Sequence, residues 1–168
     1  MTITEAALTN RGTAKSNRTP ADLAKEVVTT FFDRYRTHDV HGMVDLCTDD
    51  ADFRYVPYEV WLRTRVVRAD EKVATVGKPL WTHLIGAFPD LTNNVESMTA
   101  DDDGNVAVQV DIAGTQAKSF GAIACHELRY DLPHLFLFHV DRDGLIDRIV
   151  AYWDTADWYR QLGKVEAD

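Results

Sequence analysis

Apolar residues in the first half of the chain recur every three or four positions, which is the spacing of a helix with one buried face. After Thr19 this stripe comprises Leu23, Ala24, Val27, Val28, Phe31, Phe32 and Tyr35. Thr19, Pro20 and Asp22 are typical of a helix start, because a hydroxyl caps the first turn, proline needs no partner there and an acid faces the positive helix end. The pattern predicts that the fold begins with this helix.

Two more helices follow from the same spacing. Asp39 can cap a short one, whose apolar face comprises Val40, Met43, Val44 and Cys47. Residues 77–79 open a third helix, and Pro89 and Asp90 break it. Its inward positions are Leu80, Trp81, Leu84, Ile85 and Phe88.

In the second half the period changes to two, which indicates strands with one buried face. Val106, Val108, Val110 and Ile112 alternate with Ala107, Gln109, Asp111 and Ala113. We also expect strands over residues 51–58, from Val95 to a turn at 101–104, and over 134–140 and 145–153. Residues 59–76 fit either a flap-like helix or an extended excursion, and residues 116–131 are irregular.

The last two strands form a predicted hairpin, because Gly144 in the Asp-Arg-Asp-Gly turn adopts positive φ without steric cost. A two-residue turn would pair residue 140 with 145, 136 with 149 and 134 with 151. One face then comprises His134, Phe136, Phe138, Ile149, Ala151 and Trp153, and the other Leu135, Leu137, His139, Arg148, Val150, Tyr152 and Asp154. A one-residue bulge would exchange the two faces.

Composition narrows the class of protein. A chain of 168 residues is long enough for one domain, which we place at residues 20–168 after a flexible leader at 1–19. The net charge of −9 argues against nucleic-acid binding and against a polybasic hold on a membrane. The leader lacks a secretory apolar stretch, and Cys47 and Cys125 are isolated, so we expect a cytoplasmic protein without disulfides.

Helices followed by a meander of strands predict an α+β fold. We expect a cone-shaped, curved antiparallel sheet wrapped around three N-terminal helices, in the manner of cystatin-like α+β cones. The mouth of such a cone is a natural ligand cavity.

Several short motifs, in order over residues 20–163, give the chain a family resemblance. They are Thr37-His38-Asp39-Val40, Cys47-Thr48-Asp49-Asp50-Ala51, Ala87-Phe88-Pro89-Asp90-Leu91, Gly114-Thr115, Asp143-Gly144-Leu145-Ile146, Tyr152-Trp153-Asp154 and Gln161-Leu162-Gly163. With them the chain resembles the SnoaL-like (polyketide cyclase-like) family of the nuclear transport factor 2-like superfamily. The fold hosts many functions, so the resemblance implies an architecture more than an activity.

The chain departs from the catalytic positions that the resemblance implies. The acidic residue that SnoaL-like cyclases and limonene-epoxide hydrolases carry on the last strand corresponds to Ala151. The tyrosine and the base aspartate of the related steroid isomerases correspond to Phe31 and Tyr55, and a position that is often histidine is Gln116.

Four residues are candidates for acid–base chemistry. His134 is the first candidate, because imidazole titrates near neutral pH. The alternative is a structural histidine that is hydrogen-bonded to backbone groups. Tyr55 is placed to donate a hydrogen bond to a ligand carbonyl, or it is a packed tyrosine. Asp111 is a base if it faces inward, although an acid among valines more often faces water. Asp154 caps the closing helix unless a bulge turns it into the cavity.

We expect the pocket walls to comprise Phe31, Phe53, Trp81, Phe136, Phe138, Ile149, Ala151 and Trp153. His38 and His41 lack a third ligand, so neither a metal nor a cofactor is expected. The mixed face with Leu135, Leu137 and Val150 predicts a homodimer through the sheet, as is common in the superfamily the chain resembles.

Two functions are therefore open. The first is a cofactor-independent cyclase, isomerase or dehydratase of a hydrophobic polyketide-, terpenoid- or steroid-like compound. The second is a non-catalytic hydrophobic-ligand-binding or dimeric association module, which Ala151 favours.

Overall fold

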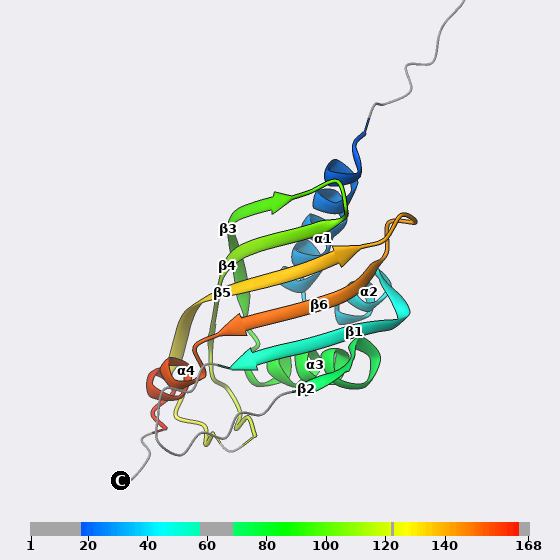
Figure 1. The fold of residues 1–168 in the computed structure, drawn as a ribbon. Helices are drawn as coiled ribbons and strands as arrows, with labels where there is room; N and C mark the ends of the chain where they lie inside the picture. Colours follow the sequence, from blue (N-terminus) through cyan, green and yellow to red (C-terminus); the bar gives the residue numbers. More distant parts are fainter. Residues whose placement is uncertain (1–17, 58–68, 122, 165–168) are drawn as a thin grey trace, which may run out of the picture.

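In the computed structural model, a curved, unclosed sheet of six strands is packed against helices (Figure 1). The structure describes residues 18–57, 69–121 and 123–164. The elements in chain order are α1 (Pro20–Arg36), α2 (Val40–Val44), β1 (Cys47–Pro57), β2 (Ala69–Lys72), the π-helical turn η1 (Val73–Gly77), α3 (Lys78–Ala87), β3 (Thr92–Ala100), β4 (Asn105–Thr115), β5 (Arg129–Val140), β6 (Ile146–Trp153) and α4 (Thr155–Gln161). This order confirms the α+β class.

The first helix begins where its sequence predicts. The Thr19 hydroxyl accepts the Asp22 amide N–H at 3.1 Å, and the Asp22 carboxylate accepts the Thr19 N–H at 3.2 Å. This reciprocal pair satisfies two amide groups that the helix leaves without partners. The buried side chains of α1 are Ala24, Val27, Val28, Phe31, Phe32 and Tyr35, so the apolar stripe faces the sheet.

The strand order is β2-β1-β6-β5-β4-β3. All neighbouring strands are antiparallel except β1 and β6, which run parallel. The sheet is therefore mixed, where we expected an antiparallel one. A parallel pair needs a long connection, and the chain supplies it with β2 to β5, which lie between these two strands in sequence.

The closing hairpin keeps the predicted faces with a different register. His134 pairs with Trp153, Phe136 with Ala151 and Phe138 with Ile149, two positions from the expected pairing. The longer turn adds one residue and a bulge between His139 and Val140 adds another. Either change alone would exchange the faces, and together they restore them.

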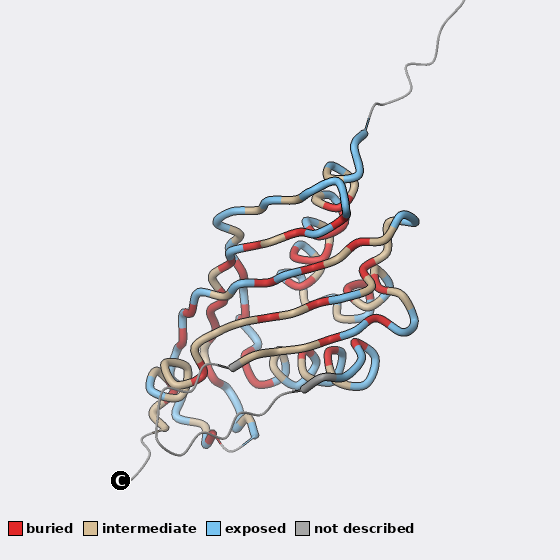
Figure 2. Tube along the Cα trace, in the orientation of Figure 1, coloured by how far each residue is buried: buried red, intermediate tan, exposed pale blue. Residues whose placement is uncertain are grey.

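The core lies between the concave face of the sheet and helices α1 to α3. Figure 2 shows buried positions alternating with less buried ones along the central strands. Rings of α1 pack edge-on against β5: Phe31 and Phe32 lie 5.2 and 5.8 Å from Phe138, measured between ring centroids. Helix α4 lies at the end of the sheet, against β5.

Some expectations fall outside the described residues. These are most of the leader, residues 1–17, and the part of the ambiguous segment at 58–68; the rest of that segment, from Ala69, forms β2 and η1. No helix among the described residues is long and apolar enough to span a membrane.

Candidate functional site

A cavity of about 190 Å³ opens where the sheet, α3, α4 and the residues Phe120, Gly121 and Ile123 meet. Its described lining comprises Tyr35, Phe53, Tyr55, Leu80, Trp81, Leu84, Ile112, Phe120, Gly121, Ile123, Tyr130, Leu132, His134, Phe136, Ala151, Trp153, Thr155, Trp158 and Tyr159. None of these residues is an aspartate, glutamate, lysine or arginine. The wall that the structure describes is therefore apolar and aromatic, with an imidazole and several hydroxyls as its side-chain polar groups besides the indole N–H groups.

His134 enters the cavity from β5 in a defined state. Its Nδ1 lies 2.9 Å from the Leu132 carbonyl oxygen. Because a carbonyl only accepts, Nδ1 carries the proton and Nε2 carries the lone pair. Burial lowers the pKa of His134 to about 4, against the smaller opposing effect of that hydrogen bond. The imidazole is therefore neutral at pH 7, with Nε2 available as an acceptor or base.

Trp153 lies between His134 and Tyr55. The Tyr55 ring stacks on Trp153 at 4.9 Å between centroids with an interplanar angle of 18°, and His134 lies 5.6 Å from Trp153. Burial raises the pKa of Tyr55, so its phenol remains a hydrogen-bond donor at neutral pH. A neutral imidazole and a phenol donor thus flank one flat apolar surface.

Besides Tyr55 and the partly buried Tyr159, three nearly fully buried hydroxyl residues line the cavity, and sequence reasoning missed them as polar groups. Tyr35 and Tyr130 are each 2% exposed, and Thr155 is 7% exposed. Tyr35 was interpreted only as part of the helical stripe. Tyr130 lies four residues before His134, so period two places it on the same face of β5; that spacing is the signal that could have identified it.

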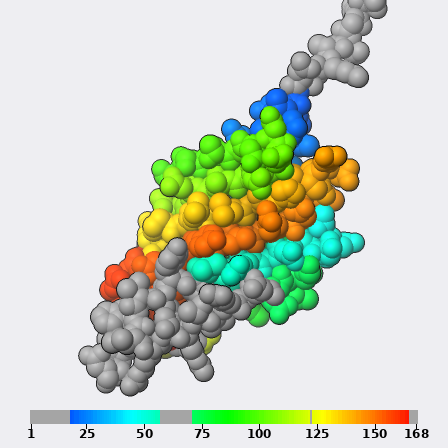
Figure 3. Space-filling model, in the orientation of Figure 1, coloured from blue at the N-terminus to red at the C-terminus, as the bar shows by residue number. Residues whose placement is uncertain are grey.

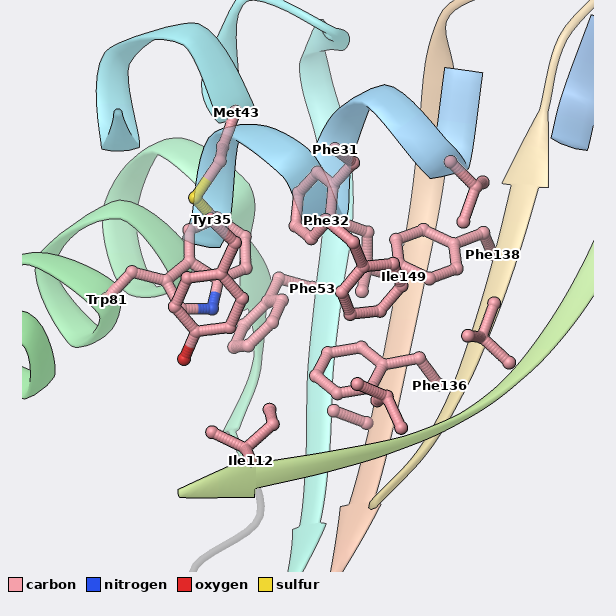
Figure 4. Close-up of a cluster of buried hydrophobic side chains, with 14 of the residues drawn as sticks. Phe31, Phe32, Tyr35, Met43, Phe53, Trp81, Ile112, Phe136, Phe138 and Ile149 are labelled. Carbon is pink, nitrogen blue, oxygen red and sulfur yellow. The ribbon is translucent and has the colours of Figure 1, made fainter. Parts of the chain in front are cut away.

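Five of the eight expected wall residues line the cavity: Phe53, Trp81, Phe136, Ala151 and Trp153. Phe31, Phe138 and Ile149 do not, and for these three the expectation is wrong. They are buried in the core, because the rings of α1 fill that end of the cone (Figure 4). The prediction of which sheet face is buried is correct, but α1 covers the part of this face that contains Phe138.

The two aspartate candidates lie elsewhere. Asp111 alternates with the buried Val110 and Ile112 and lines a groove outside the cavity, so the inward-facing alternative is wrong. Asp154 lines the same outer groove, and its Oδ1 accepts the Asp157 amide N–H at 2.9 Å. Asp154 therefore caps α4, as the sequence predicts in the absence of a bulge at this residue.

Gln116 organises the segment that closes one side of the cavity. Its side-chain oxygen accepts the His126 N–H at 3.1 Å, and its Nε2 lies 3.5 Å from the Ile123 carbonyl oxygen. Phe120 packs against Trp158 of α4 at 5.5 Å between centroids. This buried glutamine therefore acts on the cavity through the loop, without lining it. Among the described residues, no group of three or more His, Cys, Asp or Glu side chains is arranged to hold a metal ion.

Comparison with known families gives one match, to a family model described as a SnoaL-like domain, over residues 28–149. No curated protein matches the chain significantly.

Several solved structures share the architecture. A candidate SnoaL-like polyketide cyclase from Jannaschia sp. CCS1 is 19% identical, with a TM-score of 0.70 over 92% of this chain and 99% of that one. AclR from Streptomyces galilaeus, a candidate hydroxylase, is 17% identical, with a TM-score of 0.69 over 86% and 87%. SalBIII, an epoxide hydrolase/cyclase-like enzyme with a role in pyran ring formation in salinomycin, is 20% identical, with a TM-score of 0.58 over 80% and 92%. At these identities the likeness shows the fold.

Proposed function

The chain belongs to the SnoaL-like domain family of the nuclear transport factor 2-like superfamily, and we propose that it is a cofactor-independent enzyme that rearranges an uncharged, ring-containing carbonyl compound in its cavity. The reaction class is enolisation followed by ring closure, isomerisation or dehydration. The observation that carries the proposal is a neutral His134, with Nε2 unprotonated, in an aromatic cavity whose described lining has no carboxylate.

The cavity favours a small, flat and uncharged ligand. An engineered apolar cavity of about 150 Å³ binds benzene, so about 190 Å³ suits one or two rings. Trp81, Trp153 and Trp158 provide flat walls. An ionised ligand would lose its hydration without meeting an opposite charge among the described lining residues, which disfavours it.

His134 is the proposed base. It takes a proton from the carbon next to the ligand carbonyl. The electron pair of the broken C–H bond then delocalises onto the carbonyl oxygen, which forms an enolate. The Tyr55 phenol stabilises the enolate oxygen by hydrogen bonding. The imidazolium then returns the proton to another carbon in an isomerisation, or to the new alkoxide when the enolate carbon attacks a second carbonyl and closes a ring.

The low pKa of His134, about 4, limits the substrate. A weak base deprotonates only carbon that is already acidic, since the proton transfer must not be too far uphill. Suitable carbons lie between two carbonyls, or between a carbonyl and an aromatic ring. The apolar surroundings also make the imidazolium short-lived, which favours return of the proton to the same molecule.

The similar structures support this class of chemistry without fixing the reaction. They include a candidate polyketide cyclase and an enzyme of pyran ring formation.

The function is tested by incubating the protein with cyclic ketones, 1,3-diketones and epoxides of one to three rings and following product formation. We expect turnover by the parent protein and a loss of about 10²-fold or more in His134→Gln, the range of a lost general base. The matched control is His139→Gln on the same strand, because His139 lies outside the cavity and bonds Asp147 at 2.6 Å. Equal turnover by the parent and His134→Gln would overturn the assignment.

A non-catalytic binding protein is the second candidate. The observation that favours it is Ala151, which is 1% exposed on the cavity wall where related enzymes are expected to carry an acid. Tight binding of ring compounds without any turnover across the panel would select this function.

We also propose that the protein is a homodimer through the outer face of the sheet. Leu135 and Leu137 are 38% and 37% exposed there, and they pair with Tyr152 and Val150 of β6. Figure 3 shows β3 to β6 as adjacent bands on this face, uncovered by helices. Burying such neighbouring apolar side chains is a common basis of symmetric dimers.

A further inference from the structure

The hydroxyls of Tyr35, Tyr130 and Thr155 are the least explained polar groups of the cavity. All three residues are more than nine-tenths buried. The Thr155 Oγ1 has no hydrogen-bond partner, and no hydrogen bond joins either phenol to another residue in the parts of the chain that the structure describes. All three residues line the cavity.

The three residues come together from different elements. Tyr130 lies near the start of β5, opposite Gly114 of β4, and its ring is 6.0 Å from Trp158 of α4. Thr155 is the first residue of α4. Tyr35 lies in the last turn of α1, and Figure 4 shows its hydroxyl oxygen at the edge of the aromatic cluster, on the side of Ile112.

The two phenols are close enough to influence each other. The proximity of Tyr35 adds to the effect of burial in raising the pKa of Tyr130. Burial likewise raises the pKa of Tyr35. Both phenols therefore stay protonated and available as donors at neutral pH.

Buried hydroxyls without partners are unfavourable, because each has lost its hydrogen bonds to water. In folded proteins, more than about 90% of buried backbone polar groups and most buried side-chain polar atoms have a hydrogen-bond partner. The Thr155 Oγ1 is such an exception, and the Tyr35 and Tyr130 phenols line the cavity without a hydrogen-bond partner in the described parts of the chain. A molecule that enters the cavity is therefore the partner that these hydroxyls fit.

We propose that Tyr35, Tyr130 and Thr155 form a hydroxyl subsite that binds an uncharged oxygen substituent of the ligand, a hydroxyl or a carbonyl, at the end of the cavity away from His134. Tyr130 and His134 lie on the same face of β5, four residues or roughly 13 Å of strand apart. Tyr130 and His134 therefore contact different parts of the ligand. The inference rests on the proposed function, since it assumes that the cavity binds a small molecule, and it identifies the substrate as one with a second oxygen remote from the reacting carbonyl.

The test compares two probes that differ in one remote oxygen. 2-Tetralone has two fused rings and a single carbonyl, and 6-hydroxy-2-tetralone adds a hydroxyl at the far end. Binding is followed by tryptophan fluorescence, because Trp81, Trp153 and Trp158 line the cavity. We expect the parent protein to bind the hydroxylated probe about threefold to tenfold more tightly, the effect of one or two neutral hydrogen bonds.

The variants Tyr35→Phe, Tyr130→Phe and Thr155→Val each remove a hydroxyl and almost nothing else. We expect them to reduce or abolish the preference for 6-hydroxy-2-tetralone while leaving the affinity for 2-tetralone within about twofold of the parent. Tyr152→Phe, which makes the same change on the outer face of the sheet, should preserve the preference.

Thermal unfolding without ligand gives an independent readout. Removing a hydroxyl that has no partner should leave the melting temperature unchanged or raise it. A lower melting temperature together with an unchanged probe preference would mean that ordered water already satisfies the subsite, and would overturn the proposal.

The outcomes separate this inference from the proposed function. If both probes bind equally to the parent, or if all three variants keep the preference, the subsite proposal fails, but the proposal that the cavity binds a ligand does not. If neither probe binds, the proposed function fails and the subsite fails with it.

Discussion

His134 is defined by its surroundings more than by its residue type. The Leu132 carbonyl fixes its tautomer, and burial lowers its pKa to about 4. The sequence indicated a candidate acid or base at this position, since alternation along β5 assigns the face. It could not indicate the protonation state, which depends on burial beside Trp153 of β6 and on the hydrogen bond to Leu132.

The pKa of His134 predicts a loss of stability in acid. Between about pH 6.5 and 4 the unfolded chain binds a proton at this residue and the folded protein does not, so the free energy of unfolding falls as the pH falls through this window. At pH 4.5 this contribution is roughly 2–3 kcal/mol. We expect the free energy of unfolding, measured in urea, to fall between pH 7.5 and pH 4.5 in the parent protein. In His134→Gln this fall should be smaller by about the same amount. Equal differences in the two proteins would contradict the burial of a neutral imidazole.

Asp154 is predicted to stabilise α4 and to take no part in catalysis. Its Oδ1 accepts the Asp157 N–H at the helix start, and its side chain lies outside the cavity. Replacement of such a cap by alanine costs about 1 kcal/mol. We expect that loss of unfolding free energy in Asp154→Ala, and little loss in Asp154→Asn, because asparagine caps equally well. Turnover reduced equally in both variants would instead assign the carboxylate to the reaction.

Among the elements, short sequence patterns predicted the features that depend on neighbouring residues, such as helix starts and buried faces. The cap and stripe of α1 predicted both its start and its buried face. The faces of the closing hairpin were also correct, but its register was not. The Asp141 carboxylate accepts the amide N–H groups of Asp143 and Leu145, each at 2.9 Å, which lengthens the turn. The predicted faces are nevertheless correct, because the bulge between His139 and Val140 shifts the register by one more residue and so offsets the effect of the longer turn.

The loop after β4 is predicted to depend on Gln116. Without the Gln116 side chain, the His126 N–H loses its 3.1 Å partner inside the protein. We expect Gln116→Ala to lower the free energy of unfolding by about 1–3 kcal/mol, the cost of unsatisfied buried groups and lost packing. Binding of 2-tetralone should also weaken, because Phe120 and Ile123 of this loop line the cavity.

Gln116→Met is the matched control for shape, because it fills most of the space of this 1% exposed residue without burying a charge. Ligand binding should weaken less than in Gln116→Ala. Unchanged binding in Gln116→Ala would show that the loop is held independently of this residue.

At the scale of the whole molecule, the cone depends on contacts that short sequence patterns do not contain. The parallel pairing of β1 with β6 joins segments about a hundred residues apart. The division of the concave face between core and cavity is likewise a property of the assembled fold. Phe138 and Phe136 are alike in sequence terms, yet Phe138 packs against both Phe31 and Phe32 and does not line the cavity, whereas Phe136 packs against Phe32 and lines it.

The outer face gives a prediction about assembly. We expect Leu137→Lys to convert a dimer to a monomer in analytical ultracentrifugation, because a charge there would lose its hydration at the interface. Leu128→Lys is the control, since Leu128 is similarly exposed, at 41%, and precedes β5 in the loop. A parent protein that sediments as a monomer at micromolar concentration would contradict the dimer.

In the proposed reaction, His134 removes a proton from a carbon acid bound in the cavity. Deuterium exchange at C1 of 2-tetralone, followed by ¹H NMR in D₂O, measures this step, because exchange reports proton removal whatever the final product. We expect faster exchange with the parent protein and with His139→Gln than in buffer, and a loss of about 10²-fold or more in His134→Gln. Exchange at the buffer rate with bound probe, or equal acceleration by His134→Gln, would contradict it.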